Sequence, residues 1–157
     1  MSDKPKDRTH KAIMQNRRAR HEFEIVSTLE AGIVLQGTEV KSLRAGKANM
    51  QDAYVIFPDN HKNEMYVTGL HINPYEQGNR ENHEPLRLRK LLVHAKEAIK
   101  LRTQMQEKGM ALIPLSMYFA GSIIKMEIGV GRGKKLYDKR AATKDRDVKR
   151  ELQRILK

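Results

Sequence analysis

The sequence contains no cysteine among its 157 residues, and only 5% of the residues are aromatic. Without cysteine, neither a disulfide framework nor a thiolate metal site can form, which is typical of proteins in a reducing compartment. We therefore expect a cytoplasmic protein. The low aromatic content argues against a long track on which single-stranded nucleic acid stacks.

Long apolar runs are also missing. No stretch approaches the roughly 18 consecutive apolar residues that a membrane-spanning helix needs, and residues 1–20 hold no apolar run of the signal-peptide type. We expect a soluble protein. An anionic membrane surface stays open as a partner for its basic segments.

Catalytic motifs are equally scarce. GVGRGKKL resembles a phosphate-binding loop, but only three residues separate Gly129 from Gly133, and Lys135 stands where Ser or Thr is required. None of the six histidines is paired at the i, i+4 spacing of a helical zinc site, and no G-x-S-x-G nucleophile motif occurs. We expect no enzyme, no metal and no cofactor.

Positive charge is present in excess and lies at the two ends of the chain, which has a net charge of +12. Seven basic and two acidic residues give +5 to residues 1–20, and eleven and four give +7 to residues 132–157, so residues 21–131 are balanced. Dispersed charge would serve solubility equally well, so the polarised charge indicates a polyanionic partner. Nucleic acid and anionic lipid both fit this pattern.

The charge pattern also predicts the domain organisation. Residues 1–20 have too little apolar surface to fold alone, which predicts a flexible basic arm. Residues 21–131 suffice for one core and are expected to form a single domain. Residues 132–157 form a basic tail with a narrow apolar stripe from about residue 141, and we expect its helix to order only on binding.

Periodicity within residues 21–131 predicts a mainly β fold with helices. Strands are expected at HEFEIV (21–26), GIVLQG (32–37), AYVIF (53–57), MYVTGL (65–70), ALIPLSMYF (111–119) and SIIKMEIGVG (122–131). The third and fourth should pair, and the last two should form a hairpin in which Pro114 marks an edge or a bulge. Residues 73–87 read as a long surface loop.

Two helices are expected within this domain. A short one should begin at Thr38 and lack a capping box, because Lys41 stands where Glu or Gln is needed. A longer one should bury Ala98, Leu101 and Met105. With the strands, these helices predict a small antiparallel barrel of the oligonucleotide-binding (OB) type, with about six strands and two to three helices.

The stretch GTEVKSLRAGKAN (37–49) carries a regular basic pattern. Lys41, Arg44 and Lys47 recur every three residues and predict a basic edge beside the barrel, although a solvated helix face explains the spacing equally well. RNA is bound through phosphate contacts together with stacking and base-edge hydrogen bonds, for which Asn49 and Tyr54 are suitable residue types. Structured RNA that is recognised by shape suits this edge better than a long single strand.

Five stretches of the sequence carry a family resemblance: NRRARHEF (16–23), EAGIVLQGTEVKSLRAGKAN (30–49), PYEQGN (74–79), RKLLVH (89–94) and GRGKKLYDKR (131–140). Together they closely resemble the SsrA-binding protein family (small protein B, SmpB) of bacterial trans-translation. The resemblance spans nearly the whole chain. It implies an OB-like RNA-binding barrel that grips the tRNA-like domain of transfer-messenger RNA (tmRNA, or SsrA RNA) and completes a particle that mimics tRNA.

The resemblance also implies the partners of that particle. Alanyl-tRNA synthetase charges it, and elongation factor Tu with GTP escorts it to the empty A site of a stalled 70S ribosome. The C-terminal tail would then become helical on the 16S rRNA, in the decoding centre and the empty mRNA channel. The result would be ribosome rescue and tagging of the incomplete polypeptide for degradation.

Residue roles follow from the same resemblance, position by position. On or supporting the tmRNA face it places Arg18, Arg20, Glu30, Lys41, Arg44, Lys47, Asn49, Leu92 and Lys125. On the ribosome it places Lys134 and Lys135 at the start of the tail, Tyr137, Asp138, Lys139 and Arg140 at the decoding centre, and Lys144 and Arg146 in the channel-lining helix. The tail after Arg146 is variable in the family, so the resemblance implies no roles for Val148 to Lys157.

Three rival classes share parts of this pattern. A general RNA-binding or ribosome-associated OB-fold protein would have the same charge distribution. A nuclease would need a divalent metal, and a peripheral membrane protein would bind anionic vesicles.

Overall fold

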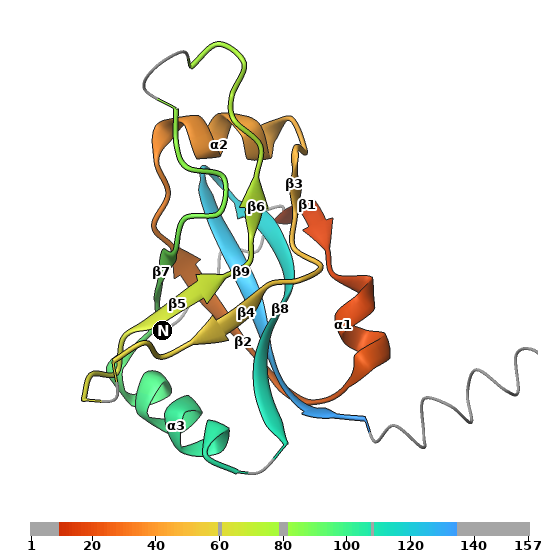
Figure 1. Ribbon diagram of the computed structural model, residues 1–157, viewed down its shortest axis with the longest axis vertical. Coiled ribbons are helices and arrows are strands. Elements are labelled where there is room, and N and C mark those ends of the chain that lie inside the picture. Colours follow the sequence, from red (N-terminus) through yellow and green to blue (C-terminus); the bar gives the residue numbers. More distant parts are fainter. Residues whose placement is uncertain (1–9, 60, 79–81, 108, 135–157) are drawn as a thin grey trace, which may run out of the picture.

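The computed structural model describes residues 10–59, 61–78, 82–107 and 109–134. Within these ranges lie β1 (His10–Gln15), α1 (Arg17–Glu22), β2 (Phe23–Ile33), α2 (Gly37–Arg44), β3 (Ala48–Asn49), β4 (Tyr54–Ile56), β5 (Met65–Thr68), β6 (His71–Ile72), β7 (Arg89–Leu92), α3 (Ala95–Met105), β8 (Met110–Ala120) and β9 (Ile123–Gly133) (Figure 1). The predicted mainly β class with two to three helices is confirmed.

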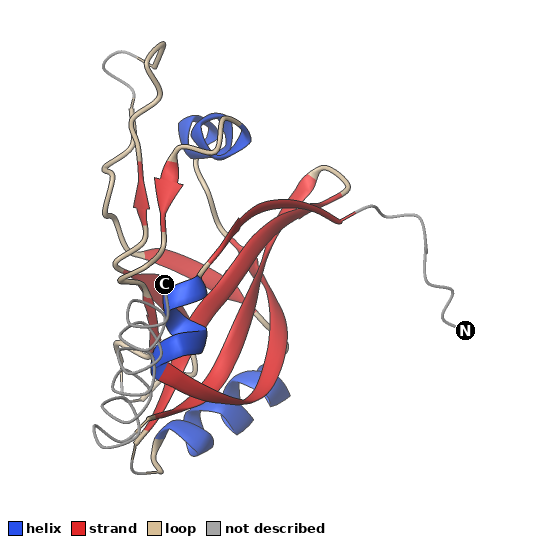
Figure 2. Cartoon of the chain, turned by 90° about the vertical axis from the view of Figure 1, so that its right-hand side faces the viewer, coloured by secondary structure: helices blue, strands red, loops and turns tan. Residues whose placement is uncertain are grey.

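Six strands close into an antiparallel barrel. The main sheet has the order β1-β8-β4-β5-β7-β2-β9, and an additional pairing of β8 with β9 joins its two sides. β1 lies outside this ring, because it shares one edge of β8 with β4. Closure leaves few exposed strand edges, as expected of a small OB-like barrel, and Figure 2 shows the curved strands wrapping around it.

The core fills the barrel with aliphatic and methionine side chains. The hydrophobic residues with no exposed surface in the described part of the chain are Val67, Leu70, Ile72, Leu112, Met117, Met126 and Ile128. α2 covers one end of the barrel and α3 lies near the other (Figure 1). None of the described helices is long and apolar enough to cross a membrane.

The long hairpin of β8 and β9 confirms the predicted pairing of the two C-terminal strands. Their register shifts between Pro114 and Ser116, so Pro114 marks a bulge rather than an edge. A proline has no N–H to donate to the ladder, and a bulge accommodates that loss. The predicted pairing of β4 with β5 is also confirmed.

β2 differs from the prediction, because it is one strand of 11 residues rather than two. The prediction of a second strand at 32–37 is wrong, because β2 ends at Ile33. Beyond that end, the Val34 N–H still donates a hydrogen bond to the Lys90 carbonyl (2.9 Å). β9 pairs along almost the whole length of β2 and holds it continuous.

The flexible-arm prediction is wrong for residues 10–20. β1 pairs with β8, and the buried Asn16 is the N-cap of α1. The Asn16 amide donates to the carbonyls of Met50 (3.1 Å) and Pro114 (3.0 Å), and its oxygen accepts from Ala19 N–H (3.2 Å). The segment therefore needs no apolar core of its own. Residues 1–9 lie outside the described residues.

α3 agrees with the prediction, whereas α2 begins earlier in the sequence than predicted. α3 buries Ala98 and Leu101 as predicted. α2 begins at Gly37, so Gln36 rather than Thr38 is its N-cap. The expected absence of a capping box is wrong for the same reason: Glu39 occupies the third position, and its carboxylate accepts from Gln36 N–H (2.8 Å).

Candidate nucleic-acid interface

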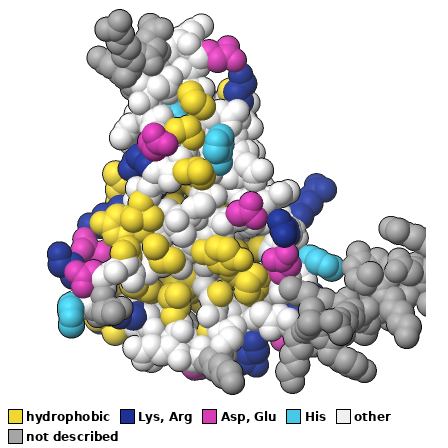
Figure 3. Space-filling view, in the orientation of Figure 1, with side chains coloured by type: hydrophobic (Ala, Val, Ile, Leu, Met, Phe, Trp, Pro, Cys, Tyr) yellow, Lys and Arg dark blue, Asp and Glu magenta, His cyan; other side chains and the backbone are white. Residues whose placement is uncertain are grey.

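Figure 3 shows one face of the molecule, on which hydrophobic side chains gather over β4 and β5 and charged side chains border them. The basic candidates lie on α1, on α2 and the turn after it, and on β9.

α2 carries the predicted basic edge. The helix buries Glu39, Ser42 and Leu43, and the same spacing leaves Lys41 and Arg44 exposed. This is the pattern of an amphipathic helix on a barrel end. The structure therefore brings two of the three predicted basic residues together on one helix.

The loop after β6 contributes to the same edge. Lys41 Nζ lies 5.3 Å from the centre of the Tyr75 ring, and Lys47 Nζ lies 3.2 Å from a Glu76 carboxylate oxygen. Tyr75 thus stands beside the basic residues with its ring available for cation–π contact. Sequence analysis did not single out Tyr75 as an interface residue.

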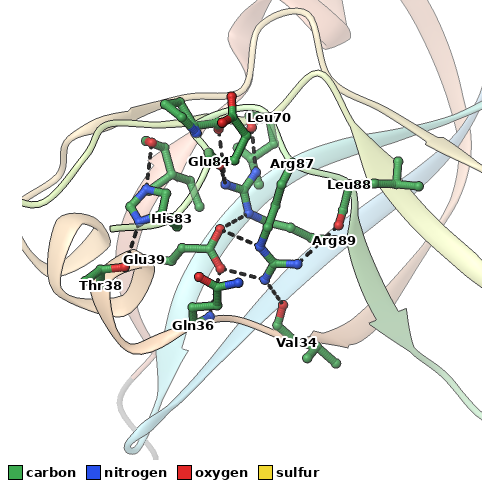
Figure 4. Close-up of polar contacts among 12 residues, drawn as sticks. Val34, Gln36, Thr38, Glu39, Leu70, His83, Glu84, Arg87, Leu88 and Arg89 are labelled. Atoms are coloured by element: carbon green, nitrogen blue, oxygen red, sulfur yellow. Dashed lines mark hydrogen bonds and ion pairs between the residues drawn. The ribbon is translucent and has the colours of Figure 1, made fainter. Parts of the chain in front are cut away.

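A buried ion-pair network fixes α2 on the barrel (Figure 4). The Glu39 carboxylate accepts from Arg89 Nε (2.5 Å) and from an Arg87 guanidinium nitrogen (2.7 Å). Glu39 and Arg89 have no exposed side-chain surface. Arg89 also donates to the carbonyls of Leu70 (2.7 Å) and Pro85 (3.1 Å). In the described ranges no buried side-chain nitrogen or oxygen lacks a hydrogen-bond partner.

His83 ties the long loop to the same helix. Its Nδ1 is hydrogen-bonded to Thr38 Oγ1 (2.8 Å) and its Nε2 to the Ile72 carbonyl (2.9 Å) (Figure 4). Ser42 Oγ donates to the Asn73 carbonyl (2.7 Å). No helix or strand lies in the described residues 73–78 and 82–87, so these bonds, rather than regular structure, hold the loop against α2.

Burial and ion pairing act in opposite directions on Glu39. Burial alone raises the pKa of this carboxyl, but hydrogen bonds from Arg87, the Gln36 N–H and Arg89 outweigh it and hold the pKa below its ordinary value of 4.5. The carboxylate therefore stays ionised at neutral pH and keeps both arginines paired.

We expect this carboxylate to make stability depend on acidity. A carboxyl whose pKa is lowered by folding stabilises the folded state above its unfolded pKa, and the contribution is lost as the pH falls through the folded pKa. Urea unfolding of the wild type and Glu39→Gln, from pH 7 to pH 3, should show a stability difference that narrows below about 4.5. A difference that stays constant with pH would contradict the assignment.

A second group of candidates lies on the outer wall of the barrel. Gly32 of β2 is opposite Leu92 of β7 on one side and Lys125 of β9 on the other. Residues directly opposite on antiparallel strands share a face. Leu92, which is 53% exposed, and Lys125 therefore flank Gly32 on one face of the sheet. Glu30 lies two residues before Gly32 in β2 and so belongs to the same face.

Tyr118 of β8 connects this group. It is opposite Lys125, and its hydroxyl donates to the Glu30 carboxylate. Burial, the Glu30 hydrogen bond and the nearby carboxylates all raise the pKa of Tyr118, so the hydroxyl keeps its proton. Arg20 reaches the same wall through an ion pair with Glu127 (3.6 Å).

Two candidates stand apart from both groups. Arg18 pairs with Glu22 (2.9 Å) and Asp52 (3.4 Å). Asn49 uses its side-chain oxygen locally, accepting from Gln51 N–H (2.8 Å). The predicted face is therefore divided into an α2 group (Lys41, Arg44 and Lys47) and a barrel-wall group (Arg20, Glu30, Leu92 and Lys125).

The tail candidates are mostly outside the described residues. Lys134 is exposed, and its N–H donates to the Glu22 carbonyl (3.1 Å). The others lie beyond the described ranges: Lys135, Tyr137, Asp138, Lys139, Arg140, Lys144 and Arg146. In the part of the chain that is described, no group of three or more metal-ligating side chains could hold an ion.

Comparison with known proteins gives a consistent family match. A family model described as SmpB protein matches residues 13–157. Proteins named SsrA-binding protein are 52% identical in Magnetococcus marinus, over 95% of this chain and 97% of that one, and 50% identical in Staphylococcus carnosus, over 98% and 97%. A solved structure described as "tmRNA-SmpB: a journey to the center of the bacterial ribosome" is 47% identical, with a TM-score of 0.65, and covers 78% of this chain and 85% of that one.

Proposed function

Because this chain belongs to the SmpB family, we propose that it binds the tRNA-like domain of tmRNA and delivers it to stalled ribosomes. The observation that carries this proposal is the 47% identity to a solved chain described as "tmRNA-SmpB: a journey to the center of the bacterial ribosome". The family resemblance read from the sequence motifs is thereby confirmed. A ribosomal partner sets the proposed activity in the cytoplasm.

The α2 group is one of two surfaces that contact the RNA in this proposal. Lys41 and Arg44 are exposed on a helix whose buried side is fixed by the Glu39 network. A guanidinium and an ammonium in a fixed position are suited to phosphate and base edges. The buried ion pairs hold α2 in place before RNA binds. Less conformational entropy is then lost when Lys41 and Arg44 contact the RNA.

The barrel-wall group supplies contacts of another kind. Glu30 is an acceptor for base amino or imino groups, and Tyr118 orients it. Leu92 offers apolar surface beside Lys125. This mixture of acceptor, apolar and cationic groups favours recognition of a particular folded RNA over uniform binding to phosphate.

The tail completes the proposed role. Its basic residues would contact 16S rRNA in the decoding centre and the empty mRNA channel, from Lys134 and Lys135 through Tyr137, Asp138, Lys139 and Arg140 to Lys144 and Arg146. Alanyl-tRNA synthetase and elongation factor Tu with GTP act on the complex through the bound RNA. The chain itself acts as a binding adaptor.

The double variant Lys41→Ala/Arg44→Ala tests the RNA face. We expect its affinity for the tRNA-like domain of tmRNA to fall by about 2–4 kcal/mol, or roughly 30- to 1,000-fold, because two preorganised cations are removed. If both side chains meet phosphates, the log–log salt slope should become shallower by about 2. Filter binding across a salt series measures both quantities.

The matched control is Lys96→Ala/Lys100→Ala on α3, which removes the same charge near the opposite end of the barrel. Its affinity should stay within about threefold of the wild type, as expected of a small long-range electrostatic effect. Equal losses in both variants would mean that only net charge matters, and bulk tRNA should then compete as well as tmRNA. That result would favour a general RNA-binding protein.

A further inference from the structure

A cleft opens beside the α2 group, at the C-terminal end of that helix. It has a volume of about 460 Å³ and lies between α2, β1 and the β8–β9 turn. Arg44 lines it from the helix, Lys11 and Ile13 from β1, and Phe119 and Ser122 from the hairpin. Among these, only Arg44 is in the RNA face predicted from the sequence.

Among the described residues of the interface, the two cations of the cleft resemble Lys41 and Lys125, which have no ion pair, and differ from the basic residues that pair with carboxylates. Within the described part of the chain, neither Lys11 nor Arg44 has an ion pair or a side-chain hydrogen bond, whereas Arg18, Arg20 and Lys47 all pair with carboxylates. The described residues that line the cleft include no Asp or Glu. The cleft is therefore a place of unneutralised positive charge, which attracts an anion.

An apolar wall stands directly beside these cations. Lys11 is opposite Phe119 in the register of β1 and β8, so their side chains share one face of the pair. Ile13 and Phe119 are partly buried against the core, and Leu43 below them is 1% exposed. The exposed Ser122 adds a hydroxyl at the rim.

We propose that this cleft holds one nucleotide of the bound RNA, with its base against Phe119 and Ile13 and its phosphate between Lys11 and Arg44. The inference rests on the proposed function and adds Lys11, Phe119 and Ser122 to it. The volume lies within the range of about 300–1,000 Å³ that small-molecule sites occupy. RNA loops commonly present a single unstacked base to an aromatic side chain beside basic groups.

Two single substitutions at exposed positions test the cleft in the full chain. Lys11→Gln removes one cation, and Ser122→Phe fills the rim; neither side chain is part of the core. In filter binding to the tRNA-like domain of tmRNA, each should weaken affinity by about tenfold or more, as expected for loss of one stacked base or its phosphate contact. Lys96→Gln on α3 is the matched control and should stay within about twofold. Thermal unfolding verifies that all variants are folded.

A titration with mononucleotides gives an independent readout. In ¹H–¹⁵N spectra of the wild type, 5′-mononucleotides should shift the amides of residues 11–13 and 119–122, inorganic phosphate should shift them less, and Ser122→Phe should abolish the response. Absence of these shifts, or equal shifts with phosphate alone, would overturn the nucleotide assignment.

The two measurements separate the inference from the proposed function. If the wild type binds the RNA and the cleft variants bind it equally well, the cleft inference is wrong and the proposed function stands. If nucleotides shift the amides but Lys11→Gln and Ser122→Phe bind the RNA with unchanged affinity, the cleft binds free nucleotides and its assignment to the RNA is overturned. If the wild type does not bind the RNA, the proposed function fails, and the nucleotide titration alone decides what the cleft binds.

Discussion

Arg89→Met is expected to lower the free energy of unfolding by about 3–5 kcal/mol, because it leaves the fully buried Glu39 carboxylate without its closest cation. The same substitution orphans the carbonyls of Leu70 and Pro85, which accept from Arg89. Arg87 already contacts both Glu39 oxygens, at 3.2 and 2.7 Å, so it has no further contact to offer in place of Arg89. Urea denaturation at pH 7 measures the loss.

The matched control is Arg20→Met, which breaks an exposed ion pair with Glu127. Exposed pairs contribute about 0–1 kcal/mol, so this variant should unfold close to the wild type. The double variant Glu39→Gln/Arg89→Met should recover part of the loss, because no unpaired buried charge remains. Equal destabilisation by Arg20→Met and Arg89→Met would show that the Glu39 network has no special role.

Arg89→Met should also lower the affinity for the RNA. α2 is held by Glu39 on its inner side, so a weakened network leaves Lys41 and Arg44 on a less fixed helix. At a temperature where Arg89→Met is still folded, its affinity for the RNA should fall less than that of Lys41→Ala/Arg44→Ala, because both cations remain. The two effects are therefore separable as positioning and contact.

Much of the fold could be predicted from periodicity because the barrel strands follow it closely. Ile124, Met126, Ile128 and Val130 alternate along β9, and all four are buried. The spacing of Ala98 and Leu101 likewise predicted the inner side of α3. Where one face of an element packs on the core, the sequence pattern carries the structure.

The Glu39 network was missed because charged residues are read as exposed by default. A signal was present: in β7, Arg89 and Leu91 alternate with Lys90 and Leu92, so the period that buries Leu91 also buries Arg89. The start of α2 was missed for a similar reason, since Gln36 is a weaker N-cap type than Thr38. Only the three-dimensional pairing of Glu39 with Arg87 and Arg89 selects the earlier start.

The barrel-wall group and the cleft depend on registers that no local pattern specifies. Bulges interrupt β1 between Ala12 and Met14, β2 between Ile25 and Ser27, and β8 between Pro114 and Ser116. Each bulge shifts which residues face each other. The pairing of Lys11 with Phe119 across β1 and β8, and the hydrogen bond from Tyr118 to Glu30, depend on these registers and could not be derived from the sequence.

Truncation after Gly133 is expected to abolish tagging of polypeptides on stalled ribosomes while leaving affinity for the tRNA-like domain of tmRNA within about threefold. The barrel should survive, because β9 ends at Gly133 and both groups of the interface lie within residues 10–133. The deleted residues 134–157 carry most of the C-terminal excess of positive charge, which the proposed role assigns to contacts with 16S rRNA.

A reconstituted translation reaction on a message without a stop codon measures tagging directly, and filter binding measures the RNA complex. Full-length Lys96→Ala/Lys100→Ala controls for a general loss of positive charge and should still support tagging. Because each neutralised phosphate steepens the salt dependence, added salt should reduce tagging by the full-length protein at concentrations that still permit tmRNA binding. A truncated chain that tags stalled polypeptides at the wild-type level would overturn the proposed role of the tail, whereas loss of tmRNA binding on truncation would move part of the RNA interface out of the barrel.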